Sequence, residues 1–284
     1  MIREHVVERP EGLLHAHLAG DTGPPVVLLS GAGLDNAMLS WSRLIPDLAR
    51  DHRVIALDWP KQGRSRPWDG RATHQILLRS ISDVLDDLGV EKAAVVGLSQ
   101  GGAMTLAYAI EHPERVERLV ALAPGGTLSF PPFVHQLLWL MAKVRLLHDT
   151  LPNLVFRNRS MTAAFVRRAL FGDASQVDDL DAIVDAVLAE ARSGNAGSSD
   201  WQNDSIGFRR MRIDLRPRLH EIRCPALFVQ GDRDAGVPVA RTAEAARLVP
   251  GARLEVLPGR GHWSNRESPD EVNALIRKFL TGDH

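Results

Sequence analysis

Short apolar runs alternate with longer amphipathic stretches along most of the chain. The apolar runs lie at residues 26–29 (VVLL), 54–57 (VIAL), 93–96 (AAVV), 119–123 (LVALA), 226–229 (ALFV) and 254–257 (LEVL). Continuous apolar runs of this length are typical of strands buried on both faces of a parallel sheet. Apolar residues at helical spacing occupy 38–49, 74–88, 103–112, 241–248 and 269–280. The pattern predicts an α/β fold, with a mostly parallel twisted sheet and helices on both of its faces.

Two further β-like stretches open the chain, at residues 6–7 and 13–18. Only a few residues separate them, which is the spacing of an antiparallel hairpin. We expect this hairpin at one edge of the sheet.

The segment 127–214 interrupts the alternation because it contains no strand-like run. It holds helix-like stretches at 134–147, 161–171 and 177–191, followed by a Gly/Ser-rich stretch at 193–200 (SGNAGSSD) that resembles a loop. We therefore predict a core formed by residues 1–126 and 215–284, and a helical cap formed by residues 127–214. Ligands of open α/β sheets bind at the carboxyl ends of the strands, where such a cap would lie. The alternative is a helical subdomain that only packs against the core.

Composition narrows the class of protein and its partners. The chain has 284 residues, of which 44% are hydrophobic and 24% charged, as in soluble globular proteins. A net charge of −1 provides no broad field for nucleic acid or for an anionic membrane, so we expect neither as a partner. The N-terminus is charged where a signal peptide is apolar, and no apolar run approaches the ~20 residues of a membrane span. We expect cytoplasmic residence and leave a homo-oligomer open.

Metal and disulfide chemistry find little support in the sequence. A single cysteine, Cys224, cannot form an internal disulfide or a zinc cluster. The 11 histidines are scattered, and none forms a pair at ligand spacing near a suitable carboxylate. We therefore predict no metal and no cofactor.

The strongest chemical signal is the sequence Gly97-Leu98-Ser99-Gln100-Gly101-Gly102, between a strand-like run and a helix-like stretch. A G-x-S-x-G motif in this context is a nucleophile elbow, a tight turn that presents the serine above the sheet. Glycines on either side let the neighbouring backbone approach closely. Ser99 is therefore the candidate nucleophile.

A serine nucleophile needs a base, and the base needs an orienting carboxylate. Asp234 follows the run at 226–229, and His262 follows the run at 254–257, so both lie just past strand ends. The order Ser99, Asp234, His262 is the one expected for this architecture. Asp232 competes with Asp234, but it directly follows Gly231 and is placed to bond local backbone in a turn. We favour Asp234.

The loop Ser30-Gly31-Ala32-Gly33 follows the first parallel strand and consists of small residues. Attack on an acyl carbon creates an oxyanion that backbone N–H groups must stabilise. We predict the N–H groups of Ala32 and Gln100 for this role; a generic glycine turn is the alternative.

These motifs together resemble those of the α/β-hydrolase superfamily, specifically its capped members with a serine nucleophile. The sequence 58–65 (DWPKQGRS) resembles the D-x-P-x-x-G-x-S loop of that family, and 261–280 (GHWSNRESPDEVNALIRKFL) resembles its final histidine loop and helix. Two departures stand out. Ser30 replaces the usual histidine, and Lys61 and Gln62 occupy positions where small residues or histidine are frequent.

The resemblance implies hydrolysis of a small carboxylic ester, lactone or thioester through an acyl-serine, with water as co-substrate. Family members that act on carbon–halogen bonds or epoxides normally have an aspartate nucleophile, so Ser99 argues against them. A carbon–carbon bond hydrolase of dienone acids uses the same triad and remains an alternative, as does a non-catalytic ligand receptor. Aromatic residues of the cap, and tryptophans beside the catalytic loops, are candidates for the substrate pocket: Trp263, Trp41, Trp139 and Phe133, with Phe156 and Phe165 among the other cap aromatics.

Overall fold

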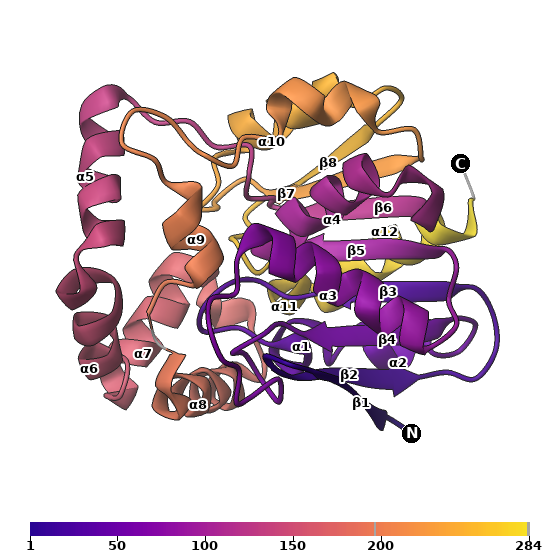
Figure 1. The fold of residues 1–284 in the computed structure, drawn as a ribbon, viewed down its shortest axis with the longest axis horizontal. Helices are drawn as coiled ribbons and strands as arrows, with labels where there is room; N and C mark the ends of the chain where they lie inside the picture. The colour runs from indigo at the N-terminus through magenta and orange to yellow at the C-terminus, as the bar shows by residue number, and fades with distance from the viewer. Residues whose placement is uncertain (196, 283–284) are drawn as a thin grey trace.

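The computed structural model describes residues 1–195 and 197–282, and its centre is an eight-stranded sheet (Figure 1). The strands are β1 (Arg3–Arg9), β2 (Gly12–Ala19), β3 (Pro25–Leu29), β4 (Arg53–Asp58), β5 (Ala93–Leu98), β6 (Val116–Leu122), β7 (Ala226–Gly231) and β8 (Arg253–Leu257). Their spatial order is β1-β2-β4-β3-β5-β6-β7-β8. β1 and β2 form the predicted antiparallel hairpin at one edge. β2 also pairs antiparallel with β4, and β3 to β8 are parallel to one another.

The order of the strands reverses between β3 and β5. From β3 the chain moves to β4 on one side, and β5 then joins β3 on the other side. The loops that leave β3 and β5 therefore diverge at the carboxyl edge of the sheet, which is where ligands of open α/β sheets bind. These two loops carry Ser30-Gly31-Ala32-Gly33 and Ser99.

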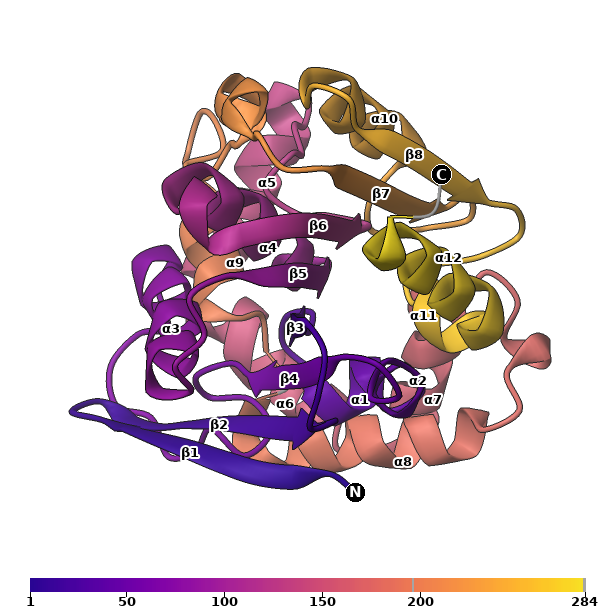
Figure 2. The ribbon, with the colours of Figure 1, turned by 90° about the vertical axis from the view of Figure 1, so that its right-hand side faces the viewer.

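Helices cover both faces of the sheet, as the pattern predicts (Figure 2). α3 (His74–Asp87), α4 (Gln100–Glu111) and α10 (Val239–Leu248) pack on one face. α1 (Ala37–Trp41), α2 (Ile45–Leu48) and α12 (Pro269–Thr281) pack on the other, and the short α11 (Ser264–Glu267) precedes α12. Successive residues of β5 alternate between the two cores, since Val95 belongs to one and Val96 to the other.

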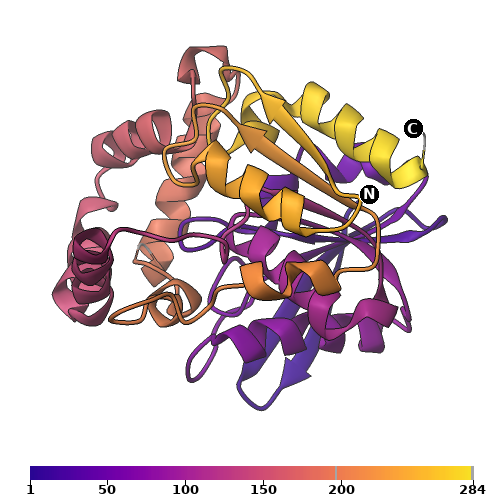
Figure 3. The ribbon, with the colours of Figure 1, turned by 90° about the horizontal axis from the view of Figure 1, so that it is seen from above.

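The remaining helices gather on one side of the sheet (Figures 1 and 3). They are α5 (Pro132–Lys143), α6 (Leu151–Val155), α7 (Arg159–Phe165), α8 (Leu180–Glu190) and α9 (Asp200–Ser205), joined in part by helical turns at Leu146–Thr150, Val166–Leu170, Ala174–Gln176 and Ala191–Asn195. Further short turns occur at Pro113–Arg115 and Arg216–Glu221. The loop predicted at 193–200 is partly helical, and Ala196 within it lies outside the described residues. Among the described residues, no helix has the length and apolar character needed to cross a bilayer.

Two details differ from the sequence-based prediction. The helix expected over 38–49 is two short helices, because Pro46 lacks an N–H group and can stand only in the first turn of a helix. The run at 254–257 is not buried on both faces. β8 is an edge strand, with no further strand beside it among the described residues, and its Glu255 and Val256 are exposed.

Candidate active site

The turn after β5 has the geometry of a strained elbow. Ser99 has φ 55° and ψ −111°, a conformation that non-glycine residues rarely adopt. The neighbouring glycines make the turn possible. A Cβ on Gly97 would lie 2.2 Å from the carbonyl oxygen of Gly101, and a Cβ on Gly101 would lie 2.1 Å from that of Leu29. Backbone strain of this kind is typical of functional sites.

The two backbone N–H groups predicted to bind the oxyanion belong to Gln100 and Ala32, which lie near Ser99. Gln100 begins α4, so its N–H group has no partner within the helix. Within the described residues, neither this N–H nor that of Ala32 donates a hydrogen bond. The loop of Ala32 lies against Ser99, because a Cβ on Gly31 would be 3.6 Å from Ser99 Cβ. Ala32 and Gln100 therefore stay the predicted donors of an oxyanion hole.

His262 and Asp234 form the predicted pair. His262 Nδ1 lies 2.8 Å from Asp234 Oδ2, and the Asp234 side chain is fully buried. Burial by itself raises the pKa of Asp234, but the hydrogen bonds from His262, Val237 and Gln230 outweigh it and hold the pKa below its usual value. The ionised carboxylate only accepts hydrogen bonds, so Nδ1 donates and Nε2 of His262 is left free to act as a base.

Asp232 has a different partner. Its Oδ1 accepts a hydrogen bond from the N–H of Gly259, 2.6 Å away in the loop after β8. The predicted backbone contact therefore exists, but it reaches across to a neighbouring loop instead of closing a local turn.

Ser99 and His262 line one cavity of about 420 Å³. Its walls come from the loop after β3 and from the helical segment, and they are largely apolar. Within the described residues, the Ser99 hydroxyl makes no hydrogen bond to His262; such contacts often tighten only when substrate binds.

The pocket residues predicted from the sequence fall into two groups. Trp263, Phe156 and Phe165 line the cavity. The predictions for Trp41, Trp139 and Phe133 are wrong. Trp41 is fully buried in the core beneath the sheet, Trp139 packs edge-on against Phe208 with 5.0 Å between ring centroids, and Phe133 is 78% exposed on α5. Residue type alone does not show which face of a helix turns toward the site. Leu170, Pro152 and Ala169 complete the apolar wall.

Sequence reasoning missed the residue that holds the loop after β3. Gln62 is buried, and its Nε2 donates to the carbonyl oxygens of Gly31, Gly33 and Asp35 at 3.2, 3.1 and 2.8 Å. One side-chain amide thus fixes both sides of Ala32. The unusual glutamine in the D-x-P loop was the only sequence signal, and nothing in the sequence indicated its partners.

Asp35 supports the same loop from beneath. Its Oδ2 accepts hydrogen bonds from the N–H of Gly31 and the hydroxyl of Ser40, both at 2.6 Å. Complete burial raises the pKa of Asp35 to about 6, although these hydrogen bonds oppose the shift. Ser30 is buried, and within the described residues its hydroxyl has no hydrogen-bond partner.

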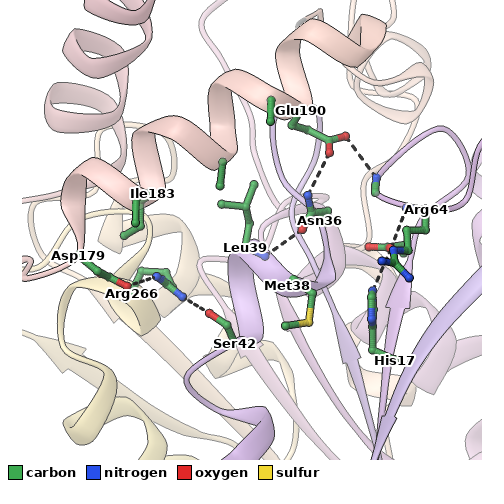
Figure 4. A pocket seen from close by; sticks show the side chains of 15 residues that line it. His17, Asn36, Met38, Leu39, Ser42, Arg64, Asp179, Ile183, Glu190 and Arg266 are labelled. Atoms are coloured by element: carbon green, nitrogen blue, oxygen red, sulfur yellow. Dashed lines mark hydrogen bonds and ion pairs between the residues drawn. The ribbon is translucent and has the colours of Figure 1, made fainter. Parts of the chain in front are cut away.

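The D-x-P loop also contacts the helical segment at two points. Lys61 Nζ lies 2.8 Å from Asp200 Oδ2 at the start of α9. At the end of α8, the buried Glu190 accepts hydrogen bonds from Asn36 (Figure 4), from the N–H of Gly63 and from Arg66. The loop therefore links the candidate oxyanion residues to α8 and α9.

Figure 4 shows a second cavity, of about 570 Å³, between α8 and α1. Glu190 and Asn36 lie at one end, and Arg266, bonded to Asp179 and Ser42, lies at the other. Neither Ser99 nor His262 lines it. We therefore place the chemistry in the smaller cavity.

Replacing Gln62 with methionine is expected to lower kcat about 10- to 100-fold with little change in KM. Methionine keeps the length of the side chain but removes the donors, so Ala32 loses its alignment with the developing oxyanion. Steady-state measurement of kcat and KM, with an ester that the wild-type protein hydrolyses, tests the prediction. The same substitution at the exposed Gln176 is the control. An unchanged kcat in the folded Gln62→Met variant would contradict the role of Gln62.

The expectation that no histidine pair lies near a carboxylate is corrected by the structure. The ligand atoms of His15, His17 and Asp58 all lie within 4.8 Å of one another. Residues two apart on β2 share a face, and the β2–β4 register sets Asp58 opposite His15. Asp58 also accepts hydrogen bonds from the N–H groups of Ala37 and Arg64, so its carboxylate anchors the loop that follows β4.

The family is now established. Residues 24–269 match the model of the family described as the alpha/beta hydrolase fold. The chain therefore belongs to the α/β-hydrolase fold family, and it is a hydrolase of that fold.

Particular relatives differ in their named activities. The chain is 29% identical over 279 residues to a 2-hydroxy-6-oxononadienedioate/2-hydroxy-6-oxononatrienedioate hydrolase of Klebsiella pneumoniae, covering 94% of this chain and 90% of the relative. Among solved structures, an enol-lactonase from Burkholderia xenovorans superposes with a TM-score of 0.78 at 24% identity, covering 98% of this chain and 100% of the other. A carboxylesterase from Bacillus subtilis gives a TM-score of 0.76 at 24% identity, covering 100% and 93%. The two structures support the fold alone.

Proposed function

We propose that the protein hydrolyses small, uncharged carboxylic esters or lactones through an acyl-enzyme on Ser99. The observation that carries this proposal is the lining of the cavity. Of the described residues that line it, none is a lysine or an arginine, whereas Phe156, Phe165 and Leu170 provide an apolar wall. A substrate carboxylate would meet the buried carboxyl of Asp35 and no permanent cation. An uncharged acyl group suits such a site.

The proposed reaction has two halves. Ser99 Oγ attacks the acyl carbon while His262 Nε2 takes its proton, and the N–H groups of Ala32 and Gln100 stabilise the oxyanion. Collapse of this intermediate breaks the acyl–oxygen bond, and the leaving alcohol takes the proton from His262. Water then attacks the acyl-serine, with His262 again as base, and the carboxylic acid is released. Asp234 stays ionised throughout and orients His262.

In this proposal residues 127–214 form the cap that selects the substrate. Pro152, Phe156 and Phe165 come from this segment and line the cavity opposite Ser99. Cytoplasmic residence, expected from the sequence, stays a prediction.

Carbon–carbon bond hydrolysis of dienone acids is the second candidate, because the Klebsiella relative is named for a dienedioate substrate. That substrate is a dicarboxylate, and its charges would need basic partners in the pocket. The lining described above provides none, which is why we place the uncharged ester first.

Parallel assays with p-nitrophenyl butyrate and a 2-hydroxy-6-oxo-dienoate decide between the candidates. We expect kcat/KM for the ester to exceed that for the dienoate by at least about 100-fold, because an unpaired substrate charge is costly in an apolar site. Faster loss of the dienoate would replace the proposal with the second candidate. If a fluorophosphonate fails to label Ser99 in the folded protein, the hypothesis of a non-catalytic ligand receptor replaces both hydrolase candidates.

A further inference from the structure

Helix α5 exposes an unusual amount of apolar surface. Phe133 is 78% exposed, and Val134, Leu137, Leu140 and Met141 on the same helix are 41–50% exposed. Leu154 on α6 is 62% exposed, and α5 and α6 follow each other along the same outer edge of the molecule (Figure 1). We call these six residues the outer patch. Phe133, Leu137 and Leu140 have the i, i+4, i+7 spacing that places side chains on one face of a helix.

The opposite face of α5 is firmly packed. His135 is buried and its Nε2 donates to the carbonyl oxygen of Gly207 at 2.7 Å, while Trp139 packs edge-on against Phe208. Ala142 is buried one turn further along. The helix therefore has a fixed orientation, with one face held by the rest of the segment and the outer patch turned away from it.

We propose that the outer patch is the contact between two copies of this chain in a symmetric homodimer. Its area fits that role. If a fully exposed large apolar side chain presents roughly 150–200 Å², the exposed fractions of the six residues amount to roughly 600 Å². A standard interface buries about 800 Å² per partner, of which about 65% is apolar in homodimers. Leu146, in the turn after α5, and Leu151, at the start of α6, are 53% and 42% exposed in addition.

The distribution of charge favours a second copy with its α5 antiparallel. From Pro132 to Ala142 the helix has no acidic or basic residue except the buried His135, and Lys143 stands at its C-terminal end. Antiparallel packing keeps the two lysines at opposite ends of the contact, and it also opposes the two helix dipoles. Helices that bind membrane surfaces carry lysine and arginine along a solvated polar face. The second face of α5 is instead packed against protein, so a lipid surface is the less favoured occupant.

The oligomeric state of the full-length protein tests the proposal. Sedimentation velocity and light scattering from about 1 to 100 µM are expected to show a mass near twice 31.2 kDa. The double variant Leu137→Glu, Leu140→Glu places four charges in a symmetric contact, so we expect its dissociation constant to rise more than about 100-fold. Both leucines are about half exposed, so the monomer should keep its fold. Retained fluorophosphonate labelling and an unchanged melting temperature at low concentration would verify this.

Val256→Glu is the matched control. Val256 is 41% exposed on β8, one of the two edge strands of the sheet, and an edge strand is another surface through which two copies could pair. We expect this variant to remain dimeric. A dimer that Val256→Glu dissociates while the leucine variant stays intact would overturn the proposal, as would a monomeric wild-type protein at every concentration. Binding of that monomer to phosphatidylcholine vesicles, abolished in the leucine variant, would assign the patch to lipid instead.

Discussion

Replacing Ser99 with alanine is expected to lower kcat by about 10⁴- to 10⁶-fold while the fold is retained. The hydroxyl is the group that would form the acyl bond, and it lies in the same cavity as His262. Alanine, like serine, carries a Cβ atom without branching, so the substitution does not change the backbone strain at the elbow. The residual rate would come from the N–H groups of Ala32 and Gln100 and from substrate binding. Ester turnover and thermal unfolding, measured on the same preparation, test both parts.

Ser82→Ala is the control for this variant. Ser82 lies on α3, where its hydroxyl is 3.2 Å from the Tyr108 hydroxyl, and it is not among the residues that line the cavity. We expect its kcat to match that of the wild-type protein. Undiminished turnover in Ser99→Ala would refute the nucleophile, whatever the control shows.

Replacing Asp234 with asparagine is expected to lower kcat by about 10³- to 10⁴-fold. Asparagine fits the same space, but its amide group presents a donor where the carboxylate accepts from His262. The imidazole would then turn or change tautomer, and Nε2 would no longer be a free base. Asparagine also disturbs the contacts of Gly236 and Val237 with the carboxylate, so unfolding must be measured beside the kinetics.

Asp232→Asn is the matched comparison, because the two aspartates are two residues apart in one loop. Asp232 contacts Gly259 and not His262, so we expect a change in kcat of less than about threefold. Equal losses in the two variants would show that the loop, and not the His262 contact, is responsible.

The pKa of Asp234 sets the pH range of that comparison. It lies below the ordinary value of 3.8, so the folded state releases this proton more readily than the unfolded state. The resulting stabilisation is present above the unfolded pKa and is lost as the pH falls through the folded pKa. In assays from about pH 6 to pH 9, Asp234 of the wild-type protein is therefore ionised throughout, and the Asp234→Asn variant is compared with that state.

Elements with strong local signals were predictable. The central strands are continuous apolar runs because both of their faces are covered, and the structure confirms them as neighbours in a parallel sheet. The edge strand β8 was misjudged, since its run contains Glu255 and gives no sign of whether a further strand follows. The prediction of a single helix over 38–49 was wrong for a local reason. It rested on the spacing of apolar residues and did not take Pro46 into account.

The candidate chemistry was also predictable to a large extent. Ser99, Asp234 and His262 each follow a strand, and parallel strands deliver their carboxyl ends to the same edge. The tertiary structure places His262 and Asp234 in contact and sets Ser99 and His262 in one cavity. The wall of that cavity was much less predictable, because an aromatic residue on a helix can face the site, the core or solvent. Phe165, Trp41 and Phe133 show these three outcomes.

The sequence by itself determined the α/β architecture, the family and the identities of the candidate nucleophile, base and acid. These follow from local periodicity and from motifs whose residues are neighbours in the chain. Only the tertiary structure decided that Gln62 and Asp35 hold the loop of Ala32, that no lysine or arginine lines the described cavity, and that α5 turns its apolar face outward. Each of these depends on contacts between distant segments, or on which side of an element is covered. Such relations arise from packing, and no local pattern records them.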